Sequence, residues 1–375
     1  MRRIVWASFG GLLVFALLPL CFYLLTLSDA SLSLRGEKQN LGAGGRVVTL
    51  RIQGSGLKTC QLSSSPQLAE LPKKISPCSS SQSTHILLPE NSSRHRQLWK
   101  FEVTAELVNK ADKALRESVK ISQAPDHRVA IFGDSFTYQM GLTEMALLRA
   151  TQAIRSTYHA FPADGICNAL PAIRRTAKEF RPEVAVLEYI GSNFDACAKT
   201  PSYGDPTVSP KSLQHWLVRQ KEDFEVAINV LRLAGVKKIY LDQGPHCDAC
   251  NIFGPGTRAT FAQLAKQYPR LVVVISPARA IEGRDRQIVS SLPCLPQEIS
   301  RGECLVPSVE GHPYAQVRGG PDGFHVCDSF KPGVLEPPGC PTYSSGAFRY
   351  AAASVTPILK HWHLKPLPVF SPSAR

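Results

Sequence analysis

From about residue 127 onward the sequence predicts an α/β domain with a parallel sheet. Short apolar runs alternate there with longer stretches of helical periodicity, and that alternation is typical of a doubly wound sheet. In addition, three polar motifs follow directly after apolar runs. Ligands of such sheets bind at the carboxyl ends of the strands, so these motifs indicate where the functional site lies.

Five short segments are predicted as the strands of the sheet. The first, residues 128–132, is apolar after its leading arginine, as expected of a strand buried on both faces. The other four are expected at residues 154–160, 184–190, 237–242 and 271–276.

The clearest helix lies between two of these strands. Ser209 is expected to cap it, Pro210 to occupy its first position and Gly235 to lie just past its end. One face of the helix is apolar and carries Leu213, Trp216, Leu217, Phe224, Ile228 and Leu231. Further helices are predicted over residues 138–150 and from Ser345, the latter interrupted at Pro357.

The N-terminus predicts export. Arg2 and Arg3 precede an uncharged stretch of 24 residues from Ile4 to Leu27, which at about 1.5 Å per residue can cross a hydrocarbon core roughly 30 Å thick. The alternative is a cleaved signal peptide ending near Ala30, although signal cores are shorter, at about 7 to 15 residues. We therefore expect a single-pass cell-membrane protein with its catalytic domain on the exoplasmic side, or else a secreted one.

The residues between this anchor and the α/β domain are expected to form a linker and a small loop-rich cap. Residues 28–45 are polar and Gly-rich, residues 46–52 have β character, and residues 98–119 show a helical pattern. The predicted organisation is an anchor at 1–30, a linker and cap at 31–126, the α/β domain at 127–362 and a disordered tail at 363–375.

Composition excludes several classes of protein. A chain of 375 residues with 43% hydrophobic and 19% charged residues can bury a core, so it is not disordered throughout. Its net charge of +13 indicates an anionic neighbourhood such as phospholipid or cell-wall polymer. The basic residues are dispersed, without a dense block interleaved with aromatics, so nucleic acid is not expected as a partner.

The cysteines fit an oxidising compartment. Cys21 lies in the apolar stretch, and the other ten of the eleven cysteines allow up to five disulfides, whose pairing the spacing does not fix. Cys247 and Cys250 beside His246 have two alternatives to a structural disulfide, a metal site and a redox pair. Because a second ligand pair is missing, the structural disulfide is favoured.

Ser135 is the candidate nucleophile. It stands in Gly133-Asp134-Ser135, between a predicted strand and a predicted helix, where the helix dipole and N–H groups favour a developing negative charge. The alternative is an ordinary turn in which Asp134 or Ser135 caps the helix.

The loops after the next two strands carry Gly165 and Asn193. The backbone N–H groups of Ser135 and Gly165 and the side-chain amide of Asn193 could form an oxyanion hole. Alternatively, Gly165 makes a turn and Asn193 caps a loop.

Asp322 and His325 are three residues apart before the last predicted helix. Within a turn this spacing lets the carboxylate reach Nδ1 of the imidazole, which leaves Nε2 to accept a serine proton. The alternative is a histidine in a surface loop.

With these motifs in this order, residues 127–361 resemble the SGNH-hydrolase superfamily, also called GDSL-type. The resemblance implies a flavodoxin-like three-layer α/β/α sandwich with a parallel sheet. It also implies that Ser135 is the nucleophile, His325 the general base and Asp322 its orienting acid, beside an oxyanion hole of Ser135, Gly165 and Asn193. Two positions depart from the family pattern: Phe136 stands where leucine is commoner, and Phe194 follows Asn193 where aspartate is usual.

The predicted function is that of an exported, membrane-tethered serine esterase or O-acyltransferase that forms an acyl-serine on the way to an envelope carbohydrate or lipid. The layout resembles the exported SGNH domains of bacterial envelope acyltransferases. Such a mechanism requires no cofactor and no metal. Hydrolysis and transfer both remain open, because the acceptor depends on how the pocket excludes water. The alternative is an inactive SGNH-like module that binds an anionic envelope polymer.

Overall fold

The computed structural model describes residues 30–69, 71, 81–93, 95–108, 113–162, 164–189, 210–246, 254–304, 306–309, 312–319, 325–327 and 345–365. The chain divides into two compact units, Met1–Asp126 and His127–Arg375. The predicted membrane anchor falls on residues outside the described part, apart from Ala30. Among the described residues, no helix is long and apolar enough to cross a membrane. The predicted disordered tail lies outside the described residues from 366 onward.

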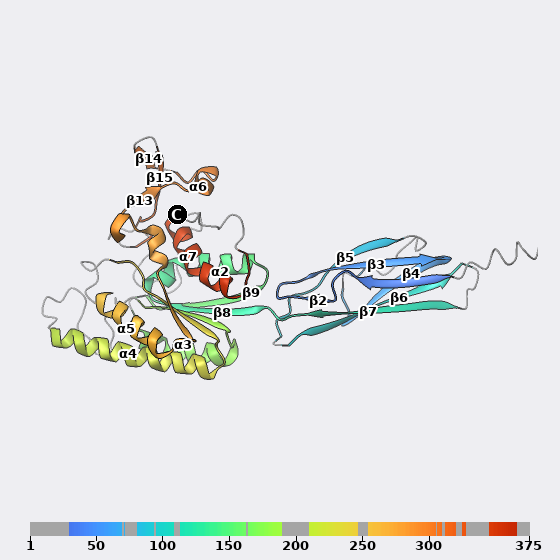
Figure 1. Cartoon of the computed structure of the whole chain (residues 1–375), viewed down its shortest axis with the longest axis horizontal. Helices are drawn as coiled ribbons and strands as arrows, with labels where there is room; N and C mark the ends of the chain where they lie inside the picture. The colour runs from blue at the N-terminus through green and yellow to red at the C-terminus, as the bar shows by residue number, and fades with distance from the viewer. Residues whose placement is uncertain are drawn as a thin grey trace, which may run out of the picture. The chain divides into compact units, whose positions relative to one another are not determined.

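The second unit is built on a five-stranded parallel sheet (Figure 1). Its strands are β8 (His127–Gly133), β9 (Ile154–Ala160), β10 (Val184–Glu188), β11 (Lys238–Asp242) and β12 (Val272–Ile275). Their order is β12-β11-β10-β8-β9, and every neighbouring pair is parallel. The second strand of the unit is thus at one edge beside the first, which is the strand order of flavodoxin-like folds. The predicted parallel α/β sheet is confirmed.

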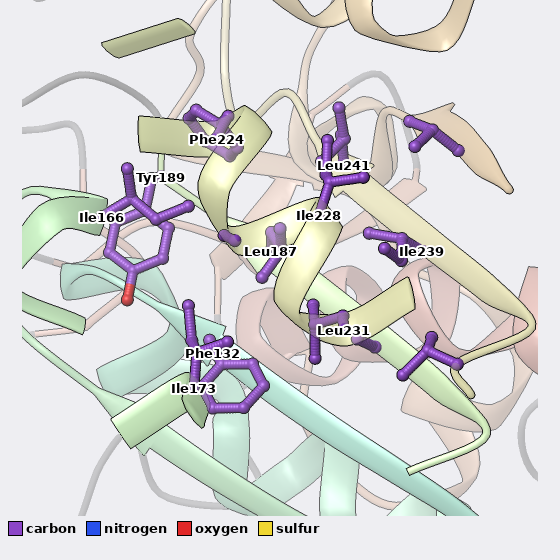
Figure 2. Packing of buried hydrophobic residues seen from close by; sticks show 14 of the residues in the cluster. Phe132, Ile166, Ile173, Leu187, Tyr189, Phe224, Ile228, Leu231, Ile239 and Leu241 are labelled. Atoms are coloured by element: carbon purple, nitrogen blue, oxygen red, sulfur yellow. The ribbon is translucent and has the colours of Figure 1, made fainter. Parts of the chain in front are cut away.

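Helices cover both faces of this sheet (Figure 1). One face carries α3 (Ile166–Glu179), α4 (Pro210–Leu233) and α5 (Gly254–Gln267), and the other carries α2 (Ser135–Ala150) and α7 (Ser345–His361). Figure 2 shows the core on the first face, where Phe132 and Leu187 of the sheet meet Ile173, Ile228 and Leu231 of the helices. Each fully buried side chain of this kind stabilises the fold by about 1.5–3 kcal/mol.

The boundaries predicted for α4 and α7 agree with the structure at three of their four ends. α4 ends at Leu233, and Gly235 follows with a φ of +91°, a left-handed conformation that favours glycine. Ser209, its predicted cap, lies outside the described residues. α7 begins at Ser345 as predicted, but the expected interruption at Pro357 is wrong, because the helix continues to His361. Ile358 and Leu359 are buried there, and their burial offsets the roughly 3 kcal/mol that an internal proline costs.

The first unit is a pair of β-sheets around a common core. One sheet has the order β1-β3-β5, with β1 (Ser31–Gly36), β3 (Val47–Ser55) and β5 (Gln82–Leu87). The other has the order β2-β7-β6-β4, with β2 (Asn40–Leu41), β7 (Ala114–Gln123), β6 (Gln97–Leu107) and β4 (Leu57–Ser65). Strand β3 confirms the β character predicted at residues 46–52. The predicted linker and loop-rich cap are wrong, because strands occupy both regions.

The predicted helix at residues 98–119 is also wrong, since β6 and β7 occupy it as an antiparallel pair. Trp99, Phe101 and Val103 are buried at every second position of β6, which is the period of a strand with one face in the core. Trp99 pairs with Ile121 of β7, which is also buried. Burial of the alternate side chains therefore decided the conformation.

A small antiparallel sheet is inserted before α7. It consists of β13 (Ser291–Pro293), β14 (Val306–Val309) and β15 (His312–Gln316), in the order β13-β15-β14, with the short helix α6 (Pro296–Ser300) beside it. A disulfide joins Cys294 to Cys304, so disulfide bonding is confirmed for these two cysteines. Arg349 of α7 binds both carboxylate oxygens of buried Glu298 in α6, at 2.7 and 2.5 Å, and this ion pair attaches the insertion to α7.

Candidate active site

A tight turn from β8 into α2 presents Ser135. Asp134 caps the helix, and its Oδ1 accepts a hydrogen bond of 3.2 Å from the N–H of Phe136. Gly133 is required by space, because a Cβ there would lie 1.9 Å from Oγ1 of Thr137 and 2.7 Å from the backbone oxygen of Glu188. That same oxygen accepts the N–H of Asp134 at 3.0 Å. We call residues 133–137 the nucleophile loop.

The structure brings Ser135 and His325 together. Nε2 of His325 lies 3.0 Å from Oγ of Ser135, although the two residues are 190 positions apart in the chain. This distance is within the hydrogen-bond reach of a general base. When Nε2 accepts the serine proton, the hydrogen of the neutral imidazole resides on Nδ1.

Gln139 fixes the segment that carries His325. Its Oε1 accepts the N–H of Val326, and its Nε2 donates to the backbone oxygen of Cys327, both at 3.0 Å. Gln139 is fully buried and lies four residues after Ser135 on α2, so it stands one helical turn away on the same face. Sequence reasoning missed this residue. Its two contacts reach residues 187 and 188 positions further along the chain, so no local spacing signals its role.

The ring of Phe136 packs against the imidazole of His325. Its ring is fully buried and stacks on His325 with the ring centroids 5.5 Å apart, and it also contacts Tyr350 at 5.7 Å. The departure from the commoner leucine therefore places an aromatic ring against the histidine.

The other predicted site residues are placed only in part. Gly165 is the N-cap of α3, just beyond the carboxyl end of β9. Asn193 and Asp322 lie outside the described residues, as do Cys247 and Cys250. In the part of the chain that the structure describes, no group of three or more His, Cys, Asp or Glu side chains could hold a metal ion.

Comparisons with known proteins find similarity among solved structures. No family model and no curated protein matches the chain. The lipase/acylhydrolase from Enterococcus faecalis is 12% identical, with 64% of this chain and 98% of that chain covered and a TM-score of 0.36. A GDSL-like lipase from Bacteroides thetaiotaomicron is 9% identical, with 62% of this chain and 88% of that chain covered and a TM-score of 0.34. AlinE4, an SGNH-hydrolase family esterase, is 15% identical, with 43% of this chain and 82% of that chain covered and a TM-score of 0.30.

Two of these solved structures are described as a GDSL-like lipase and an SGNH-hydrolase family esterase, the superfamily that the sequence motifs resemble. Identities and TM-scores this low carry no argument about the reaction.

Proposed function

We propose that the protein is a serine ester hydrolase or O-acyltransferase in which Ser135 is the nucleophile and His325 the general base. The observation that carries the proposal is the distance of 3.0 Å between Oγ of Ser135 and Nε2 of His325. An inactive binding module has no need of this contact, or of the buried amide of Gln139 that maintains it.

The first half-reaction forms an acyl-serine. His325 takes the hydroxyl proton of Ser135 while Oγ bonds to the carbonyl carbon of the ester. The tetrahedral intermediate then collapses, the bond to the leaving alcohol breaks, and the imidazolium returns its proton to that alcohol. In the second half-reaction His325 deprotonates water or an acceptor hydroxyl, which attacks the acyl-serine and regenerates Ser135.

Charge stabilisation comes from the start of α2 and the neighbouring loops. The N–H of Ser135 belongs to the first turn of a helix of 16 residues, whose dipole favours an oxyanion. We assign the further oxyanion donors to Gly165 and Asn193, and we assign to Asp322 the orientation of the imidazole through Nδ1. The substrate we propose is an acyl ester of an envelope carbohydrate or lipid. It would meet an exported, membrane-tethered enzyme whose net charge of +13 suits an anionic surface.

A serine-directed fluorophosphonate probe tests the nucleophile. The probe is expected to label the wild-type chain, and Ser135→Ala is expected to abolish both labelling and hydrolysis of a chromogenic acetyl ester. Ser156→Ala is the matched control, because Ser156 is a buried serine of the same domain whose Oγ has no hydrogen-bond partner among the described residues. Labelling that survives in Ser135→Ala would reject this nucleophile.

The second test concerns His325 and the acceptor. His325→Ala should lower kcat by about 10⁴-fold while leaving KM within a few-fold, since a base acts on the chemical step. Mass spectrometry of products formed with and without an added glycan alcohol measures how the acyl group divides between water and that hydroxyl. An unchanged kcat in His325→Ala would exclude the base.

A further inference from the structure

Two buried carboxyl groups next to the nucleophile loop contact the same tyrosine hydroxyl. Glu188 ends β10 and Asp242 ends the neighbouring strand β11, and both are at most 1% exposed. The hydroxyl of Tyr350, from α7, contacts Oε1 of Glu188 and also Oδ2 of Asp242, the latter at 3.0 Å. We call Glu188 and Asp242 the carboxyl pair.

Counting hydrogens shows that the carboxyl pair needs a proton. The hydroxyl of Tyr350 has one hydrogen, so it donates to one carboxyl oxygen and can only accept from the other. An ionised carboxylate has no hydrogen to give, and one of the two contacts would then set a lone pair against a lone pair.

The remaining oxygens of the carboxyl pair already have donors. Oγ1 of Thr137 donates to Oε2 of Glu188, and the N–H of Gly244 donates to Oδ1 of Asp242 at 2.9 Å. Every carboxyl oxygen of the pair therefore has a partner when a single proton is present. With that proton lost, the contacts at Tyr350 cannot all be hydrogen bonds.

The surroundings favour retention of that proton. Burial raises the pKa of Glu188 well above its ordinary value, and the charges of Asp242, Glu144 and Asp134 raise it further. Burial likewise raises the pKa of Asp242, with an added contribution from Glu144. Among the described residues, no basic side chain forms an ion pair with either member.

The carboxyl pair is joined to the nucleophile loop at three points. Thr137, bound to Glu188, lies in the first turn of α2, and the N–H of Asp134 donates to the backbone oxygen of Glu188 at 3.0 Å. The third point is the ring of Phe136, which contacts both Tyr350 and His325. A change in the pair is thereby transmitted to the loop that holds Ser135.

We infer that Glu188 and Asp242 share a single proton in the folded protein, and that the hydrogen bonds of this carboxyl pair with Tyr350 and Thr137 position Ser135 for attack. The second half of the inference rests on the proposed function, whereas the first half does not. Tyr350 is fully buried, so these are positioning residues that do not touch the substrate.

The direction of the pH dependence follows from the raised pKa values. A buried acid whose pKa is raised in the folded state contributes stability that is complete below the pKa of the unfolded chain and is lost as pH rises through the folded value. The free energy of unfolding should therefore fall over the pH range between the ordinary carboxyl pKa and the raised pKa of the folded protein. Catalysis should fall there too, because loss of the shared proton breaks the contacts that hold the nucleophile loop. Glu144, which faces the pair from α2 and whose pKa burial raises to about 7, contributes a loss of stability of its own that is complete just above that pH.

Tyr350→Phe removes the shared hydroxyl and keeps the ring that packs on Phe136. We expect kcat for the chromogenic ester to fall roughly 10- to 100-fold with KM within twofold of wild type. Tyr240→Phe is the matched control, because the hydroxyl of Tyr240 also bonds to α7, but through the backbone oxygen of Pro357 at 3.1 Å and not through a carboxyl of the pair. A kcat for Tyr350→Phe equal to that of Tyr240→Phe would overturn the positioning role.

Glu188→Gln provides a second test that does not depend on the folding of the first variant. The amide mimics a protonated acid: its oxygen accepts from Thr137, and its nitrogen donates to Tyr350, whose hydroxyl then donates to Asp242. Glu188→Gln should therefore exceed Glu188→Ala in kcat by at least about tenfold. The decrease of its kcat with rising pH should also begin at a higher pH than in wild type. Equal activities in the two variants would overturn the inference.

Stability against pH separates the inference from the proposed function. Urea unfolding from about pH 5 to about pH 9 should show a steeper alkaline loss in wild type than in Glu188→Gln. This measurement requires no catalysis, so it stands even if Ser135 proves not to be a nucleophile. Equal slopes in the two proteins would reject the shared proton.

Discussion

Gln139→Met tests whether Gln139 positions His325, the proposed general base. The substitution keeps the length of the side chain and removes both hydrogen bonds of 3.0 Å, to the N–H of Val326 and to the backbone oxygen of Cys327. Each backbone group that is left buried without a partner costs about 1–3 kcal/mol. The structure in which His325 lies beside Ser135 is therefore disfavoured by about 2–3 kcal/mol, allowing for partial relief by water.

That free energy converts directly into a rate. A difference of about 2.7 kcal/mol corresponds to roughly 100-fold in the population of the productive arrangement, so kcat/KM for the chromogenic ester should fall by about that factor. The loss should be smaller than in His325→Ala, because stacking on Phe136 and the hydrogen bond of 2.9 Å from Gly319 N–H to the oxygen of Val326 still hold the segment.

The assay compares two buried glutamines. Ester hydrolysis and the rate of fluorophosphonate labelling are measured for Gln139→Met and for Gln220→Met, whose amide is buried on α4, away from the histidine segment, and whose Oε1 accepts from Thr257. If Gln139→Met loses no more activity than Gln220→Met, Gln139 does not position the base.

Two further substitutions test the packing around α7. Gly346→Ala would place a Cβ 2.1 Å from the backbone oxygen of Val317, so α7 must shift. We expect a melting temperature several degrees lower, against little change for Gly42→Ala, where nothing lies within 4 Å. Arg349→Met leaves Glu298 as an unpaired buried charge, which should cost about 3–5 kcal/mol of unfolding free energy. A urea midpoint equal to that of wild type would contradict that expectation.

The parallel sheet was predictable because its strands are buried on both faces and therefore read as apolar runs. The prediction at residues 154–160 coincides with β9. The helix prediction at residues 98–119 failed because two signals conflict there. Lysine and glutamate favour helices, while the period of two at Trp99, Phe101 and Val103 indicates a strand. The local pattern contained both signals, and only the pairing with β7 decides between them.

In the site, local motifs indicated Ser135 and His325, because a nucleophile at a strand–helix turn and an Asp-x-x-His spacing are visible in the sequence. The roles of Gln139, Tyr350 and Glu188 were not predictable in this way. Each depends on contacts between segments more than 100 residues apart, or on two neighbouring strand ends, and no spacing rule encodes them.

Helix α2 carries both Ser135 and the amide that grips the histidine segment. A tilt or slide of this helix therefore moves donor and acceptor together, and the distance between hydroxyl and imidazole is insulated from such motion. The surrounding loops can accordingly shift during evolution to admit bulky substrates, while the distance between the Ser135 hydroxyl and the His325 imidazole stays the same.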